Sequence, residues 1–154
     1  MRIPSETDGV IKLALNDSGL VDGHVVAAGQ LRQGKAPSMA AMVTGLALIE
    51  ILRPRRSKLL PRHFVLALTE NEAFAFKASG GSGEEASSVY MLNIREEVVA
   101  RYPRSAISLT VEDGEKSKGG TMTINGESFP VARPNLNGEP NTDELIAVLT
   151  SASP

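Results

Sequence analysis

Side-chain alternation along residues 63–78 is the feature that most restricts how this chain can fold. Large apolar side chains occupy every second position in HFVLALT (63–69) and again in EAFAFKA (72–78), with smaller apolar residues between them. Successive side chains of a strand point to opposite faces of the sheet, so this spacing predicts two strands. Only Glu70 and Asn71 separate the two runs, which predicts a tight hairpin.

Further short runs predict that the sheet continues on both sides of this hairpin. Strands are expected over 24–31, 107–112, 118–124 and 127–131, the last two joined by Asn125-Gly126, a pair typical of hairpin turns. Residues 89–94 and 97–102 fit either strands or turns. Consecutive short strands joined by hairpins indicate an antiparallel sheet, here of about seven strands.

Two amphipathic helices are expected near the ends of the chain. The first follows Ser5 or Thr7 as its cap and ends at Gly19, with its apolar stripe formed by Val10, Ile11, Leu13, Ala14 and Leu15. The second covers 143–150 after a cap at Asn141 or Thr142, with three aliphatic side chains facing inward: Leu145, Ile146 and Leu149.

The least polar stretch of the chain, residues 39–52, predicts a further helix between Ser38 and Pro54. Its small pair Ala41 and Gly45 would let another backbone approach closely. A helix that is apolar on every side is buried or lies in lipid. This one carries Glu50 and is shorter than the about 20 residues of a membrane span, so no integral membrane segment is expected. Its candidate interaction face consists of Met39, Met42, Val43, Gly45, Leu46 and Ile49.

A basic segment follows this apolar stretch directly. Residues 53–62 carry five cations and no acid, whereas the whole chain has a formal net charge of −2. The five are Arg53, Arg55, Arg56, Lys58 and Arg62. Arginine suits phosphate oxygens, so the segment is a candidate contact for an anionic membrane surface. A solvated linker is the alternative, and the absence of interleaved aromatic residues disfavours nucleic acid.

Catalytic and cofactor motifs are missing from the sequence. The chain has no Cys, which excludes disulfides, Cys-ligated zinc and thiol catalysis. The two histidines, His24 and His63, have no metal-ligand spacing, and no GxSxG motif marks a nucleophile. Residues 114–121 have Gly120 where a phosphate loop needs lysine. No catalytic residue, metal or cofactor is therefore predicted.

These patterns predict one α+β domain over residues 1–154: an N-terminal extension of helices and a strand (1–58), then a strand-rich core (59–154) closed by the last helix. The hairpin LPRHFVLALTENEAFAFKA, the strand AISLTVED, the hairpin TMTINGESFPV and the closing TDELIAVLTSA together resemble bacterial pleckstrin-homology-like proteins. The N-terminal VVAAGQL looks like that of small actinobacterial members. The resemblance implies a bent, seven-stranded antiparallel sheet capped by the C-terminal helix, and it implies no substrate.

The function expected is that of a non-catalytic binding module, contacting an anionic membrane surface or a protein partner. Self-association through residues 39–52 is the first alternative, and a small enzyme of unknown chemistry is the second. The absence of a basic, apolar leader favours a cytoplasmic location, peripheral to the membrane if the basic segment binds lipid.

Overall fold

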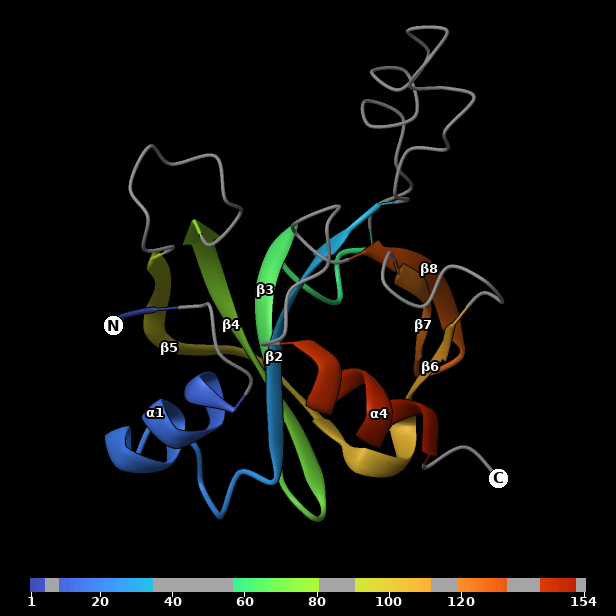
Figure 1. Ribbon diagram of the computed structural model, residues 1–154. Coiled ribbons are helices and arrows are strands. Elements are labelled where there is room, and N and C mark those ends of the chain that lie inside the picture. Colours follow the sequence, from blue (N-terminus) through green and yellow to red (C-terminus); the bar gives the residue numbers. More distant parts are fainter. Residues whose placement is uncertain (5–8, 35–56, 81–90, 112–118, 133–141, 152–154) are drawn as a thin grey trace, which may run out of the picture.

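The computed structural model describes residues 1–4, 9–34, 57–80, 91–111, 119–132 and 142–151, and its core is one antiparallel sheet (Figure 1). The spatial order of the strands is β1-β5-β4-β3-β2-β8-β7-β6. The strands are β1 (Arg2–Pro4), β2 (Ala27–Gln33), β3 (His63–Leu68), β4 (Glu72–Gly80), β5 (Met91–Pro103), β6 (Ile107–Val111), β7 (Gly119–Ile124) and β8 (Glu127–Ala132). The helices are α1 (Val10–Ser18) and α4 (Asp143–Ser151), with a short 3₁₀ turn, η1 (Arg104–Ala106).

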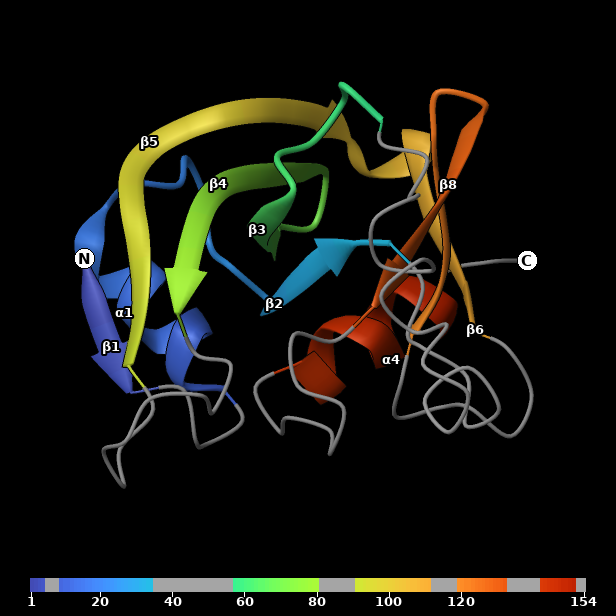
Figure 2. The same cartoon turned by 90° about the horizontal axis from the view of Figure 1, so that it is seen from above.

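The long strand β5 gives the sheet its curl. In Figure 2 it arches over β4 and runs toward the side of β6. The register between β4 and β5 shifts on either side of Phe76, because Ala75 opposes Ala100 whereas Ala78 opposes Ile94. The extra residues of β5 form a bulge, and bulges bend strands and increase their twist. The bulge lets β5 curve while it stays paired with β4 as far as Pro103, after which the chain turns into β6.

The central strands are buried on both faces. One face, with the inner side of β6–β8, packs against α4. Its fully or nearly buried members are Ala27, Leu31, Leu60, Phe64, Leu66, Leu68, Ala73, Ala75, Ile107, Leu109, Met122, Ile124, Phe129, Val131, Leu145 and Leu149. The other face packs against α1 and β1 through Ile3, Ile11, Leu15, Val21, Val25, Ala28, Val65, Ala67, Phe74, Phe76, Ala78, Leu92 and Ile94. The alternation along β3 therefore separates two apolar layers rather than a core from solvent.

Several local predictions are confirmed. Residues 63–68 and 72–80 pair as a hairpin, with Thr69 Oγ1 accepting a hydrogen bond from the Glu72 amide at 3.1 Å. Asn125 (φ 51°) and Gly126 (φ 85°) form the expected left-handed turn between β7 and β8. Gly19 ends α1 with φ 71°. The α+β class and the bent antiparallel sheet are as predicted.

Other expectations were wrong in detail. The sheet has eight strands instead of about seven, because β1, a three-residue strand with a proline, shows no periodicity in the sequence. Residues 89–94 and 97–102 do not form two elements, since β5 is continuous from Met91. The predicted strand over 24–31 begins later and ends later, as β2.

The described part of the chain has two helices; the further N-terminal helix expected over residues 39–52 lies outside it. Leu13, expected in the apolar stripe of α1, is 64% exposed, while Ile11 and Leu15 are each 1% exposed. No described helix has the length and hydrophobicity to cross a membrane.

Candidate functional site

A shallow pocket of about 260 Å³ lies across β1, β5 and the end of β4, on the face that Lys77 shares with Phe64 and not on the face covered by α1. Three cationic side chains line it, Arg2, Lys77 and Arg95. Its other lining residues are Met1, Ala78, Ser79, Asn93 and Ile94. The side chains of Ser79 and Asn93 add hydroxyl and amide donors, and among the described residues no carboxylate lines the pocket.

Strand register explains why these side chains converge. Arg2 opposes Asn93, and Asn93 opposes Ser79, so the three form one row across three neighbouring strands. Neighbouring strands lie about 4.8 Å apart, which brings such a row within reach of one small ligand. Lys77 precedes Ser79 by two residues on β4, and Arg95 follows Asn93 by two residues on β5, which places both on the same face.

Over residues 76–79 of β4 and 92–95 of β5, buried and exposed side chains alternate, which fixes the side chains that face solvent. Phe76, Ala78, Leu92 and Ile94 are buried in the layer beneath α1, whereas the residues between them are exposed. Turning the charged side chains inward would require exposing this apolar layer to water. The cationic face is therefore a consequence of the core behind it.

The short strand β1 is fixed firmly enough to hold Arg2 in place. The backbone of Met1 exchanges two hydrogen bonds with Ile94, at 2.8 Å and 2.7 Å. Ile3 is 8% exposed and packs into the apolar layer with Leu92. Both chain neighbours of Arg2 are thus fixed, Met1 by its hydrogen bonds to Ile94 and Ile3 by its burial.

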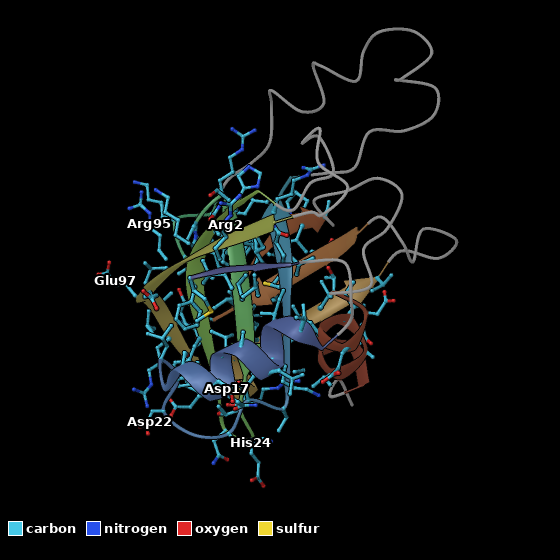
Figure 3. The ribbon with its side chains drawn as sticks, turned by 60° about the vertical axis from the view of Figure 1, so that its left-hand side comes forward. Arg2, Asp17, Asp22, His24, Arg95 and Glu97 are labelled. Carbon is cyan, nitrogen blue, oxygen red and sulfur yellow. The ribbon has the colours of Figure 1, made fainter. Side chains whose placement is uncertain are left out.

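The pocket belongs to a basic end of the molecule, where β2 and β4 finish and β3 and β5 begin. We define the basic end by Arg2, Arg32, Lys58, Arg62, Lys77 and Arg95. In Figure 3, Arg2 and Arg95 lie at one end, and Asp17, Asp22 and His24 lie at the other. Glu70 and Glu72 also lie at that opposite, acidic end, because they belong to the turn between β3 and β4. Six cations therefore share one end of the sheet, together with Glu127, which accepts a hydrogen bond from Ser57.

Electrostatics within the basic end agree with this crowding of cations. Burial lowers the pKa of the Arg32 guanidinium, and the positive charge of Arg62 lowers it further. At the acidic end a cation is paired with an acid instead, because the Glu72 carboxylate accepts two hydrogen bonds from Arg101. That contact lowers the pKa of Glu72 and raises the pKa of Arg101.

The basic end also carries the base of the segment 35–56. Gly34, where the segment starts, donates to the Pro130 carbonyl at 2.9 Å. Ser57, where it ends, is bonded to the buried side chain of Gln33, and its hydroxyl donates to Glu127 at 3.1 Å. Gly34 and Ser57, which flank the segment, are therefore both held beside β2 and β8.

The residues that the sequence singled out are only partly within the described structure. Lys58 and Arg62 are exposed and lie at the basic end. Arg53, Arg55 and Arg56 lie outside the described residues, as does the whole proposed interaction face of residues 39–52. His24 and His63 lie at opposite ends of the sheet, since His63 opposes Arg32 and His24 precedes β2.

Among the described residues, no three His, Asp or Glu side chains are grouped as metal ligands would be.

Sequence reasoning missed the three cations of the pocket. Arg2, Lys77 and Arg95 stand in unrelated parts of the sequence, so no charge cluster marks them. One usable signal was the alternation of Lys77 and Ser79 with apolar residues at the end of the second predicted strand. The pairing of β1 with β5 had no signal.

No protein-family model and no curated protein matches this sequence.

Proposed function

We propose that this domain is a non-catalytic binding module of the pleckstrin-homology-like type, which contacts an anionic surface through its basic end. The observation that carries the proposal is the gathering of cations at one end of the sheet. Six cations from β1, β2, β4, β5 and the residues before β3 gather at the end where the segment 35–56 leaves the sheet and returns. Arg53, Arg55 and Arg56 belong to that segment.

The architecture supports the assignment to this type. Seven consecutive strands, β2–β8, form one curled antiparallel sheet, and α4 packs against its inner face. The resemblance in the sequence implies this arrangement. Strand β1 and helix α1 are additions on the other face and at the β5 edge.

The electrostatics support an anionic partner in particular. A surface with one sign of charge at one end orients the molecule as it approaches an oppositely charged partner. Near an anionic membrane each Lys or Arg contributes about 1 kcal/mol. Four of the six cations are on strands, and Lys58 and Arg62 lie between the hydrogen-bonded Ser57 and β3. Their backbone would therefore need no ordering before binding.

Vesicle sedimentation tests the proposal with the full chain. Binding to vesicles that contain phosphatidylserine is expected at low salt, with little binding to neutral phosphatidylcholine vesicles and release at high salt. Neutralising the double site, Arg55→Gln with Arg56→Gln, should remove about 2 kcal/mol and weaken binding roughly thirtyfold.

A control variant keeps the same change in net charge at the other end. His24→Glu with Asn71→Glu alters two exposed residues of the acidic end and should leave vesicle binding nearly unchanged. Equal loss in both variants would mean that only net charge matters. Absence of binding by the wild-type chain to anionic vesicles would refute the proposal.

A further inference from the structure

We infer that the pocket between Arg2, Lys77 and Arg95 is a binding site for a phosphomonoester group. The inference deepens the proposed function and rests on it for the orientation of the basic end, but the site is formed by residues outside the basic segment 53–62. It names the ligand chemistry that this end recognises: a terminal phosphate, carried by a lipid headgroup or by a soluble phosphorylated molecule.

The charge of the site matches a dianion. A phosphomonoester carries about −1.5 to −2 charges at neutral pH, whereas a phosphodiester or a carboxylate carries about −1. Arg2, Lys77 and Arg95 supply three positive charges around one hollow. Lys12–Glu144 and Arg101–Glu72 are ion pairs of the described residues, and neither involves any of the three.

The donor geometry matches phosphate oxygens. The two guanidinium groups can each present a planar pair of N–H donors, and the lysine adds a compact charge. Asn93 and Ser79 lie in one row with Arg2, so neutral donors stand between the cations of β1 and β4. Ala78 and Ile94 also line the pocket, but their side chains are buried in the apolar layer behind it.

The carboxylates nearest in sequence stand outside the pocket. Glu96 and Glu97 follow Arg95 in the bulge of β5, and both are exposed. Neither lines the pocket, and Glu97 projects from β5 on the side of Arg95 that faces the acidic end (Figure 3). The bulge thus admits two acids next in the chain to Arg95 without placing them among the three cations.

The first experiment uses a soluble probe, glycerol 3-phosphate, titrated into the isotopically labelled full chain by NMR. Saturable shifts are expected at the amides of Arg2, Lys77, Ser79, Asn93 and Arg95. The variant Lys77→Gln with Arg95→Gln should weaken this binding at least tenfold. The variant His24→Glu with Asn71→Glu has the same change in net charge and should bind like the wild type.

The second experiment separates the two sources of the phosphate. Vesicles with phosphatidic acid, which bears a phosphomonoester, are compared with vesicles of equal molar content of phosphatidylglycerol, a phosphodiester. Preference for phosphatidic acid that disappears in Lys77→Gln with Arg95→Gln supports a lipid source. Saturable binding of glycerol 3-phosphate without that preference supports a soluble source.

The outcomes keep this inference distinct from the proposed function. No saturable shift with glycerol 3-phosphate, together with equal binding to the two vesicles, would overturn the phosphomonoester site. If the protein still bound anionic vesicles, and Arg55→Gln with Arg56→Gln still weakened that binding, the proposed function would stand without the phosphomonoester site. Saturable shifts in a protein that binds no vesicles would support the site and refute the membrane contact.

Discussion

The side-chain amide of Gln33 pairs with the backbone of Ser57 as a strand neighbour would. The Ser57 amide donates to Gln33 Oε1 at 2.7 Å, and Gln33 Nε2 donates back to the Ser57 carbonyl at 3.0 Å. The same Nε2 also donates to the carbonyls of Leu60 and Pro61, at 2.7 Å and 3.2 Å. One buried side chain therefore holds the chain that enters β3.

Gln33→Ala should destabilise the fold and loosen residues 57–61 first. It removes four hydrogen bonds in a place that is 3% exposed, and each buried group left without a partner costs about 1–3 kcal/mol. Water entering the space recovers part of this, so about 2–4 kcal/mol is expected from denaturant unfolding. Hydrogen exchange at the Ser57 amide should accelerate beyond the global change. An exposed site such as Asn71→Ala should alter stability by less than about 0.5 kcal/mol.

Asn16→Ala should detach the end of α1 from the chain that enters β2. The Asn16 side chain accepts from the Val25 amide at 2.8 Å and donates to the Val25 carbonyl at 3.1 Å. Losing both bonds is expected to cost about 1–3 kcal/mol in the free energy of unfolding. The neighbouring Asp17→Ala, at an exposed position, is the control. Equal effects of the two substitutions would show that helix propensity, rather than the clamp, is responsible.

Gly120→Ala should be among the most damaging single-methyl additions in the sheet. A Cβ at this position would lie 2.2 Å from the backbone carbonyl oxygen of Thr110, so β6 and β7 would have to separate. We expect a loss of more than about 2 kcal/mol, since backbone atoms cannot move aside as a flexible side chain can.

A second glycine distinguishes contact from backbone conformation. At Gly126 a Cβ meets no atom within 4 Å, but φ is +85°. Gly126→Ala should therefore cost only about 1–2 kcal/mol, from the left-handed conformation alone. If thermal or denaturant unfolding ranked Gly126→Ala as the more harmful variant, the argument from close approach would be wrong.

Tyr102 should make the fold sensitive to alkali. Its hydroxyl donates to the Leu59 carbonyl at 2.5 Å. Burial raises the pKa of the Tyr102 phenol, and the negative charge of Glu127 raises it further. Because the folded pKa exceeds the unfolded value of about 10, the contribution of Tyr102 to stability is complete below that value. It is then lost as pH rises through the folded pKa.

The Tyr102→Phe variant gives the test. It should cost about 1 kcal/mol at neutral pH and flatten the alkaline fall in unfolding free energy. An unchanged alkaline slope in Tyr102→Phe would contradict the assignment.

The elements that sequence reasoning located correctly share a local cause. The turn at Asn125-Gly126 needs two left-handed residues, and the chain offers Asn and Gly there. The β3–β4 hairpin follows from alternation on both sides of a short turn. Helix α4 follows from three inward aliphatic positions after an acidic first turn. In each case the information lies within about ten residues.

The errors also share a cause, because each depended on distant partners. Strand β1 exists through its pairing with β5, and α1 turned its Ile11 and Leu15 face inward where the Val25 clamp holds it. The continuity of β5 through its bulge depends on the path of β4 beneath it. No window of about ten residues contains both members of the β1–β5 or β4–β5 pair, and the apolar layer that Ile11 and Leu15 face is also formed by later strands.

For the candidate site the same division applies. The basic segment 53–62 is visible in the sequence because its five cations stand within ten residues, and local patterns also indicate the antiparallel α+β class. Strand pairing in the folded chain is what brings Arg2, Lys77 and Arg95 to one pocket and gathers six cations at one end of the sheet. The physical reason is that strand pairing, fixed by burial of two apolar layers, joins residues that the sequence keeps apart.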